Sequence, residues 1–481
     1  MKIKFLKDSK TCKKGEIIEC KDDEAKVIIE EGYAVEYVDK KKLKKTLKIL
    51  KDNQEALGRN AIIQDNEVHL VSKEEKEKFE LISLLKKKNI FSEITEKELD
   101  KKIVREMLTR KAIFLCACGR LVKNCQIASY NLLVNDEAGI GKDYVTEKTL
   151  EILPKAHWIK RTRISPTVFT YWHNPVFEPE WSWDGKVFYN EDISEAVLNH
   201  EVFKVMCSSG SNATIVIKQR VYDIPIEGKP VMIITTASSI PSPELIRRFE
   251  FLNLDESIDQ TKEIKKRHAE YAALGIKPEY NEKYSKAMEL LERVEVKIPY
   301  AKKLPQYFPD ESVMMRTKFP RFLDLIKAST AFHQFQRKRD DSGFLVANGQ
   351  DYEIAQEIMV KLSSNKYMIS LTKNQRKLID FFENNPNFCE NISKINEKMH
   401  NFISLPALKT NLGILTKYGL LEMILEQDSL NRDIEKYKLS DNIKGKLTNI
   451  KLPNFNELDS KVSKVSKDSK DSKDSKANLQ K

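Results

Sequence analysis

Long apolar runs are missing from this 481-residue sequence: no stretch could cross a bilayer, and no apolar segment of the signal-peptide kind stands near its N-terminus. The seven cysteines are odd in number and scattered without C-x-x-C spacing, so the sequence predicts neither a disulfide framework nor a zinc site. Two of them, Cys116 and Cys118, fall in an apolar helical run, and we expect both in a core. We therefore expect a soluble, cytoplasmic protein with no membrane partner.

The charge of the chain is unbalanced. It carries 83 Lys and Arg residues against 72 Asp and Glu residues, which gives a formal net charge of +11. A basic excess favours an anionic partner, although lysine runs are also typical of a solvated surface. Since domains contain about 100 to 200 residues, the chain is long enough for several of them.

Composition and periodicity divide the chain into seven segments. They are a small N-terminal α+β unit (1–38), a basic linker (39–55), a helical region (56–128), an α/β core (129–260), a helical lid (261–365), a winged helix (366–445) and a lysine-rich tail (446–481). In the core, the strand-like runs LLVN, KVFYN, VMIIT and FEFLNL alternate with helical segments. The tail ends in the repeat KVSKVSKDSKDSKDSK, which has nothing to bury, so we expect it to be disordered.

A glycine loop stands between the buried strand LLVN and a helix, in the sequence NDEAGIGKDYVT. This order is typical of a phosphate-binding loop, because glycines let backbone N–H groups surround an oxyanion and a helix N-terminus favours negative charge. It predicts that the chain binds ATP, although an ordinary strand-to-helix turn is the alternative. The predicted nucleotide contacts are Ala138, Gly139, Ile140, Gly141, Lys142, Asp143 and Tyr144.

The loop departs from the usual G-x-x-x-x-G-K-[ST] pattern at two positions. Asp136 replaces the first glycine, and Asp143 replaces the Ser or Thr that usually binds Mg²⁺. A carboxylate at Asp143 can ligate Mg²⁺ and suits a helix N-terminus, but it also repels a triphosphate. The departures therefore bear on the rate of hydrolysis.

An acidic pair ends the next strand, VFYN. Nucleotide hydrolysis needs one carboxylate for Mg²⁺ and one to polarise the attacking water. Asn190 stands where an aspartate is usual, so we expect Glu191 and Asp192 to share these roles with Asp143, and Glu191 to be the base. A surface turn after a strand is the alternative.

Two further groups follow in the chain. The strand VMIITT and the residues after it carry hydroxyls at Thr235, Thr236 and Ser238, which can lie beside the γ-phosphate and position the attacking water, with Thr236 as the catalytic candidate. The alternative is that threonines are merely good strand residues. Next comes an arginine pair, Arg247 and Arg248, before Phe249 and a further strand. An arginine at this place can stabilise the transition state on the nucleotide of a neighbouring subunit.

The ordered series of P-loop, acidic strand end, polar strand end and Arg-Phe resembles the core of AAA+ ATPases. The strand, basic turn and strand of residues 211–229 are similar to the pre-sensor hairpin of the minichromosome-maintenance and superfamily-three replicative helicases. That resemblance implies a homo-hexamer on single-stranded or forked DNA. It also implies DNA contacts at Lys218, with Arg220 beside it, and a second-sensor arginine at Arg316.

Residues 161–172 and the tryptophans Trp158, Trp172, Trp181 and Trp183 also resemble the helicase part of mobile-element primase-helicases. The tryptophans could stack on bases, but anchoring a small core is their more common role. We find no primase signature, neither an acidic D-x-D with its partners nor a zinc module.

The resemblance implies an ATP-dependent DNA helicase-like motor in the replication of a mobile or viral element. The alternative is a nucleotide-binding DNA initiator or scaffold with a weakly hydrolysing site. A remodeller of proteins is a weaker interpretation, because the hairpin and the winged helix would then need separate explanations. The winged helix could read a DNA groove or serve as an interaction module.

Overall fold

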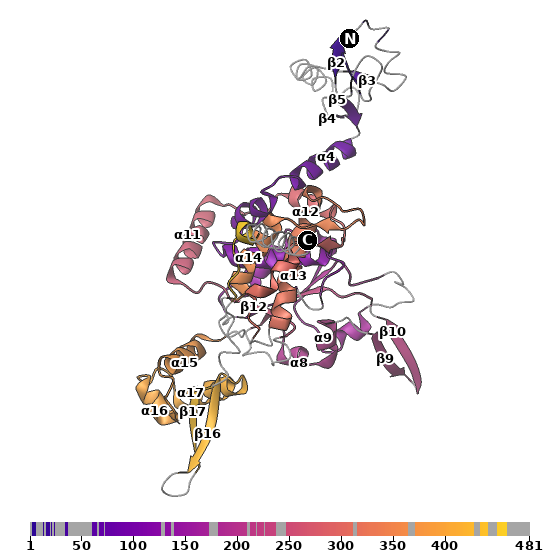
Figure 1. Cartoon of the computed structure of the whole chain (residues 1–481). Helices are drawn as coiled ribbons and strands as arrows, with labels where there is room; N and C mark the ends of the chain where they lie inside the picture. Colours follow the sequence, from indigo (N-terminus) through magenta and orange to yellow (C-terminus); the bar gives the residue numbers. More distant parts are fainter. Residues whose placement is uncertain are drawn as a thin grey trace, which may run out of the picture. The chain divides into compact units, whose positions relative to one another are not determined.

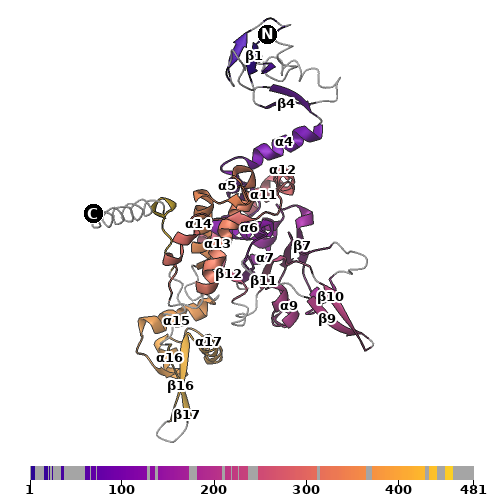
Figure 2. The same ribbon diagram turned by 45° about the vertical axis from the view of Figure 1, so that its right-hand side comes forward.

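The computed structural model describes about three quarters of the chain in two compact units, Met1–Lys87 and Lys88–Lys481. The described residues are 2–5, 13, 16–19, 21, 24, 34–36, 60–64, 67–71, 73–126, 130–135, 139–172, 181–208, 212–217, 219–225, 227–236, 247–310, 315–363, 371–427, 433–440 and 450–458. Figures 1 and 2 show them as coloured ribbons.

The described residues of the first unit include two small sheets and a helix. Strands β1 (Lys2–Phe5), β2 (Ile17–Glu19) and β3 (Ala34–Glu36) form an antiparallel sheet in the order β2-β1-β3. A hairpin of β4 (Asn60–Gln64) and β5 (Glu67–Val71) precedes helix α4 (Lys73–Leu85). We expected residues 60–71 to be part of a helical region, and that prediction is wrong, because these residues form a hairpin. The sequence favours a turn there through an Asp-Asn pair between two runs that contain Ile and Val. The predicted basic linker, residues 39–55, lies outside the described residues.

A five-stranded parallel sheet is the centre of the second unit. Its strands are β6 (Leu132–Asn135), β7 (Trp158–Arg161), β8 (Val187–Asn190), β11 (Val231–Thr236) and β12 (Glu250–Leu252), in the order β12-β6-β11-β8-β7. Strands β6, β8 and β11 are buried at every residue, as expected of apolar runs in a parallel sheet that is covered on both faces. The sequence predicts four of the five strands. It misses β7, whose run Trp-Ile-Lys-Arg is only partly buried and carries no continuous apolar signal.

Helices α6 (Met107–Cys118) and α7 (Lys142–Leu150) pack on this sheet, and the apolar residues of α8 (Glu195–Leu198) and α9 (Glu201–Met206) join its core. Helix α5 (Ile90–Ser92) packs on α6 through Phe91 and Phe114. Cys116 and Cys118 of α6 are buried, which confirms their predicted place in the core, and burial raises the pKa of the Cys118 thiol to about 12.

Three of the four tryptophans pack together beside the sheet. The ring centroids of Trp172 and Trp183 lie 4.7 Å apart, those of Trp181 and Trp183 lie 4.8 Å apart, and Trp183 is fully buried. Phe169 adds a ring contact of 5.6 Å to Trp183. The cluster confirms the interpretation of these tryptophans as anchors of a small core.

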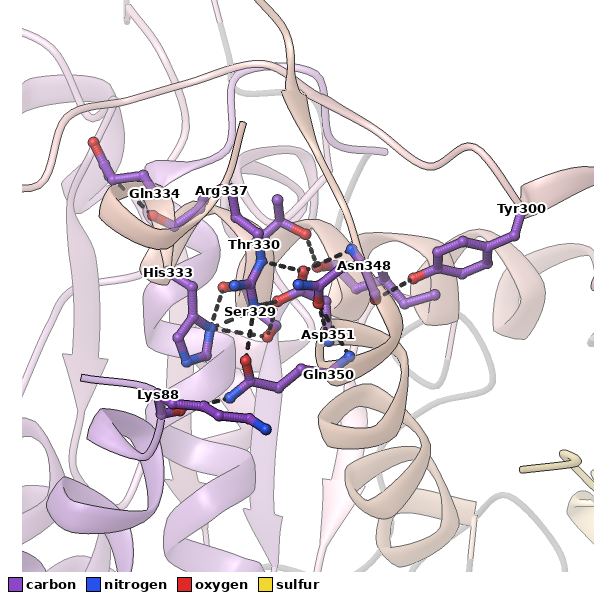
Figure 3. A network of polar contacts seen from close by, with 12 residues as sticks. Lys88, Tyr300, Ser329, Thr330, His333, Gln334, Arg337, Asn348, Gln350 and Asp351 are labelled. Carbon is purple, nitrogen blue, oxygen red and sulfur yellow. Dashed lines mark hydrogen bonds and ion pairs between the residues drawn. The ribbon is translucent and has the colours of Figure 1, made fainter. Parts of the chain in front are cut away.

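The segment after the sheet contains α11 (Ile258–Leu274), α12 (Glu282–Glu289), α13 (Met315–Phe332) and α14 (Gly349–Ser363), with a short parallel pair of β13 (Val296–Lys297) and β14 (Leu345–Val346). A buried polar network joins α13 to α14 (Figure 3). The Asp351 carboxylate accepts hydrogen bonds from Ser329 Oγ and from Arg337 Nε, both at 2.7 Å. Since each partner is buried, the network holds the two helices in one arrangement.

Part of the tail is ordered, contrary to our expectation for 446–481. Residues 451–458 return to α14, where Tyr352 donates its hydroxyl to the Pro453 carbonyl at 2.7 Å. The Phe455 ring lies 5.1 Å from that of Tyr300, and Leu458 is buried. The compositional prediction fails here because the apolar residues of this short stretch find partners that lie far away in the sequence. Residues 459–481 lie outside the described part.

The segment 371–440 forms a small helical and antiparallel unit. It contains α15 (Lys373–Asn384), β15 (Glu390–Asn391), α16 (Ile392–Lys398), α17 (Leu405–Lys417), β16 (Leu421–Gln427) and β17 (Asp433–Leu439), with the sheet order β15-β17-β16. A capping box of Thr372 and Gln375 begins α15. The sequence of this segment predicts three helices and a strand pair, which correspond to α15, α16, α17 and β16–β17. It does not predict β15.

One more hairpin stands apart from the central sheet. Strands β9 (Asn212–Ile217) and β10 (Arg220–Pro225) pair antiparallel over six residues and form their own two-stranded ribbon (Figures 1 and 2). Gln219 in the connection has a φ of 64°, which is typical of tight hairpin turns. No helix among the described residues is long and apolar enough to cross a bilayer.

Candidate functional site

The glycine loop joins the end of β6 to the start of α7. Gly139 has a φ of 90° and Gly141 a φ of 96°, which are conformations that favour glycine. A Cβ atom at either position would meet no neighbour, so backbone conformation, and not space, requires glycine there. Asp136 and Ala138 lie outside the described residues. Gly141 is the N-cap of α7, so the loop ends at the free N–H groups of the first helical turn. An anion is favoured at such a place.

Lys142 is the first residue of α7. Its side chain is 4% exposed, and no residue in the described part of the chain forms an ion pair with it. Its position at the start of α7 places the lysine beside the free N–H groups of a helix N-terminus, where an anionic ligand is favoured. Ile140 is half-buried, and Tyr144 is 47% exposed while its hydroxyl donates to the Lys102 carbonyl at 3.0 Å.

Asp143 contacts the end of β11. Its carboxylate accepts a short hydrogen bond from Thr235 Oγ1, and the same oxygen of Thr235 accepts one from the Asp192 N–H at 2.9 Å. Thr236 points to the other face of the strand, where its hydroxyl donates to the Ile193 carbonyl at 3.4 Å. The structure therefore brings Thr235, one of the predicted hydroxyls, to Asp143 at the start of α7.

The acidic strand end is tied to the edge of the sheet. Lys160 of β7 pairs with Glu191 at 3.0 Å and with Glu147 of α7 at 2.8 Å. Burial alone would lower the pKa of the Lys160 ammonium, but the two carboxylates raise it above its usual value. Asn190 is buried and donates to the Arg161 carbonyl at 2.7 Å, so it joins β8 to β7. The sequence analysis did not predict a role for Lys160, because it did not predict strand β7, on which this residue lies.

Few side chains near the glycine loop can bind a magnesium ion. No cluster of three or more His, Cys, Asp or Glu side chains in the described ranges is close enough to hold a metal by itself. Mg²⁺ usually takes one or two carboxylates and completes its shell with phosphate oxygens and waters. Asp143 and the Thr235 hydroxyl fit that donor set. Asp192 is exposed and has a φ of 47°, so its side chain leaves the strand end at a sharp turn.

The predicted arginines differ in their surroundings. Arg247 is exposed, whereas Arg248 Nε donates to Ser208 Oγ at 2.6 Å. Arg316 is exposed in the first turn of α13. In the hairpin, Arg220 is exposed and Lys218 lies outside the described residues.

The strand order places the glycine loop, Thr235 and the acidic pair at one edge of the sheet. β11 lies between β6 and β8, all three are parallel, and their carboxyl ends carry the glycine loop, Thr235 and the acidic pair. In open α/β sheets, ligands bind outside the carboxyl ends of the strands, where the order reverses. Fold and site together define an α/β P-loop core that binds a nucleotide.

Residues 74–294 match the protein family described as MTBMA_p00010 P-loop domain. The match contains the sheet and every group of the glycine-loop site. It supports a P-loop nucleoside triphosphatase, for which Mg²⁺ is the usual companion of the nucleotide. No curated protein matches the chain.

Proposed function

We propose that the protein is an ATP-dependent motor of the AAA+ helicase-like kind. It assembles as a homo-hexamer and acts on single-stranded or forked DNA in the replication of a mobile or viral element. The observation that carries the proposal is the β9–β10 ribbon, which stands in the chain between the acidic strand β8 and the polar strand β11 and pairs with neither. A ribbon of this kind with a basic turn is suited to gripping a phosphate backbone.

In this proposal the nucleotide phosphates contact the loop at Gly139 and Gly141, and Lys142 lies against the β- and γ-phosphates. Asp143 and Thr235 hold Mg²⁺, as the hydrogen bond between them supports. The attacking water is oriented by Glu191 and Asp192, one strand further along the sheet. A neighbouring subunit supplies Arg247.

We further propose that residues 371–440 are a winged helix that contacts DNA. The order of elements, helix, strand, two helices and a two-stranded wing, supports this assignment. Lys409 and Lys417 are exposed on α17, where they would contact phosphates. Direct contact with another protein is the alternative use of the same unit.

A second candidate is a nucleotide-dependent assembly switch on DNA that hydrolyses ATP slowly. The ion pair of Glu191 with Lys160 favours it, because the carboxylate oxygen that contacts the ammonium is less available to orient a water. Asp143 adds negative charge beside the triphosphate.

Turnover of ATP with and without single-stranded DNA separates these functions. The motor predicts turnover that rises when DNA is added, while the switch predicts tight nucleotide binding with slow turnover that ignores DNA. Turnover without any DNA binding would support a protein remodeller instead. The Lys142→Ala protein is the matched blank for contaminating ATPase.

A further inference from the structure

The main chain that carries Arg247 is held from behind by helix α13. Arg321 Nη2 donates to the Arg247 carbonyl at 2.7 Å, and Arg321 Nη1 donates to the Phe249 carbonyl at 3.3 Å. Arg321 is 2% exposed. One rigid guanidinium therefore grips two carbonyls of the segment that enters β12.

Glu250 completes this arrangement. It is the first residue of β12, and its carboxylate accepts a hydrogen bond from Arg321 Nη1 at 2.8 Å and pairs closely with Lys318. Burial alone would raise the pKa of the Glu250 carboxyl, but the two cations lower it, so the group stays ionised. The three side chains are at most 5% exposed, and such a triad tolerates little movement because any separation leaves a buried charge unpaired.

The triad determines where Arg247 can reach. The neighbouring Arg248 is bonded to Ser208 of its own chain, whereas the Arg247 side chain lies on the surface. The direction of an exposed side chain depends on the main chain beneath it, and here that main chain is set by Arg321 and by the pairing of β12 with β6, the strand that enters the glycine loop.

We propose that Arg321 and Lys318 are positioning residues that aim the Arg247 guanidinium at the nucleotide of a neighbouring subunit. They act through Glu250 and through the carbonyls of Arg247 and Phe249, and the inference rests on the proposed function.

The test uses two inactive proteins that complement each other. Arg247→Ala binds nucleotide but offers no arginine, and Lys142→Ala offers Arg247 but stays largely without nucleotide at an ATP concentration that fills the Arg247→Ala sites, so mixing them creates sites at which Arg247 acts in trans. The gain in turnover on mixing measures that action alone. We expect Arg321→Lys, added to the Lys142→Ala chain, to lower the gain at least fivefold, because lysine keeps the charge beside Glu250 but loses the second arm.

The same Arg321→Lys change in the Arg247→Ala chain is the matched control. That chain has no arginine to aim, so the gain should stay the same. An equal fall from either chain would show a merely structural role and overturn the inference, as would an undiminished gain from both. If Arg321→Lys does not fold, as judged by thermal unfolding, Glu250→Gln in the Lys142→Ala chain must give the same fivefold fall.

The parent mixture separates the two proposals. No gain from Arg247→Ala with Lys142→Ala, although a fluorescent ATP analogue binds the former, would mean that Arg247 does not act in trans, and both proposals would fall. A gain that survives Arg321→Lys would remove only the positioning role.

Discussion

At the scale of single residues, Lys142 is the group whose environment makes least sense without a ligand. The residue is 4% exposed and is the first residue of α7, where the partial positive charge of the N–H groups is unfavourable for a cation. A bound phosphate would offset this repulsion.

We therefore expect Lys142→Ala to lower the affinity for ATP by about 10- to 100-fold, the equivalent of about 1.5–3 kcal/mol for hydrogen bonds to a charged group. Without ligand, the variant should be about as stable as the wild type, because no residue in the described part of the chain forms an ion pair with Lys142. Equilibrium binding of a fluorescent ATP analogue and thermal unfolding measure the two effects. Lys148→Ala, on the same helix but paired with Glu151, is the control and should bind normally. Unchanged affinity in Lys142→Ala would remove the nucleotide assignment.

Thr235 and Thr236 offer a second test at this scale. Thr235→Val keeps the shape of the side chain but removes its hydrogen bonds with Asp143 and with the Asp192 N–H. We expect ATP turnover to fall at least about tenfold, as is common when a positioned polar group is removed from an active site. Thr236→Val removes the hydroxyl on the other face and should change turnover much less. The opposite ranking in steady-state kinetics would return the role to Thr236.

At the scale of elements, the segment of residues 451–458 packs on α14. The chain leaves α14 at Ser363, forms the unit of residues 371–440 and then returns to α14, so that unit is attached at both of its ends. Gly349 is required at this contact, because a Cβ atom there would lie 2.6 Å from the Phe455 ring.

Leu458→Ala should then destabilise the protein by about 2–3 kcal/mol, at the lower end for a buried leucine since the site is close to the surface. Chemical denaturation with urea measures this loss. Lys451→Ala, in the same segment but exposed, should be neutral. If both substitutions are neutral, the segment does not dock in solution.

The β9–β10 ribbon has a prediction of its own, from the sequence of its turn. Lys218→Ala should weaken the binding of single-stranded DNA without regard to base sequence and remove any stimulation of turnover by DNA, while basal turnover remains. The salt dependence should also become flatter, because each phosphate contact contributes a log–log slope of about −0.7 on single strands. A titration across salt concentrations, followed by fluorescence anisotropy, measures both quantities. An unaltered slope would mean that Lys218 is merely solvated.

At the scale of the whole molecule, the exposed Arg247 predicts that the site is complete only between subunits. We expect the protein to assemble into hexamers when ATP and Mg²⁺ are present, and Lys142→Ala to remain in smaller species, because the nucleotide bridges the two surfaces. Sedimentation velocity with and without nucleotide measures the change. Strictly monomeric protein with saturating ATP would exclude a ring.

The sequence alone determined the features that contiguous residues encode. The glycine loop needs only neighbouring backbone groups between a strand and a helix, so its motif is readable, and the apolar runs of β6, β8 and β11 are long enough to mark buried parallel strands. The same reasoning missed β7, which is half-buried, and the hairpin β4–β5.

Only the tertiary structure decided which of these groups meet. Thr235 faces Asp143 because of the register between β11 and β6, and Lys160 reaches Glu191 because β7 lies beside β8. Arg321 and the Arg247 carbonyl are 74 residues apart in the chain. Periodicity shows which face of an element is apolar, but strand order, register and the packing of distant helices arise from the whole chain, and these place the charges around the site.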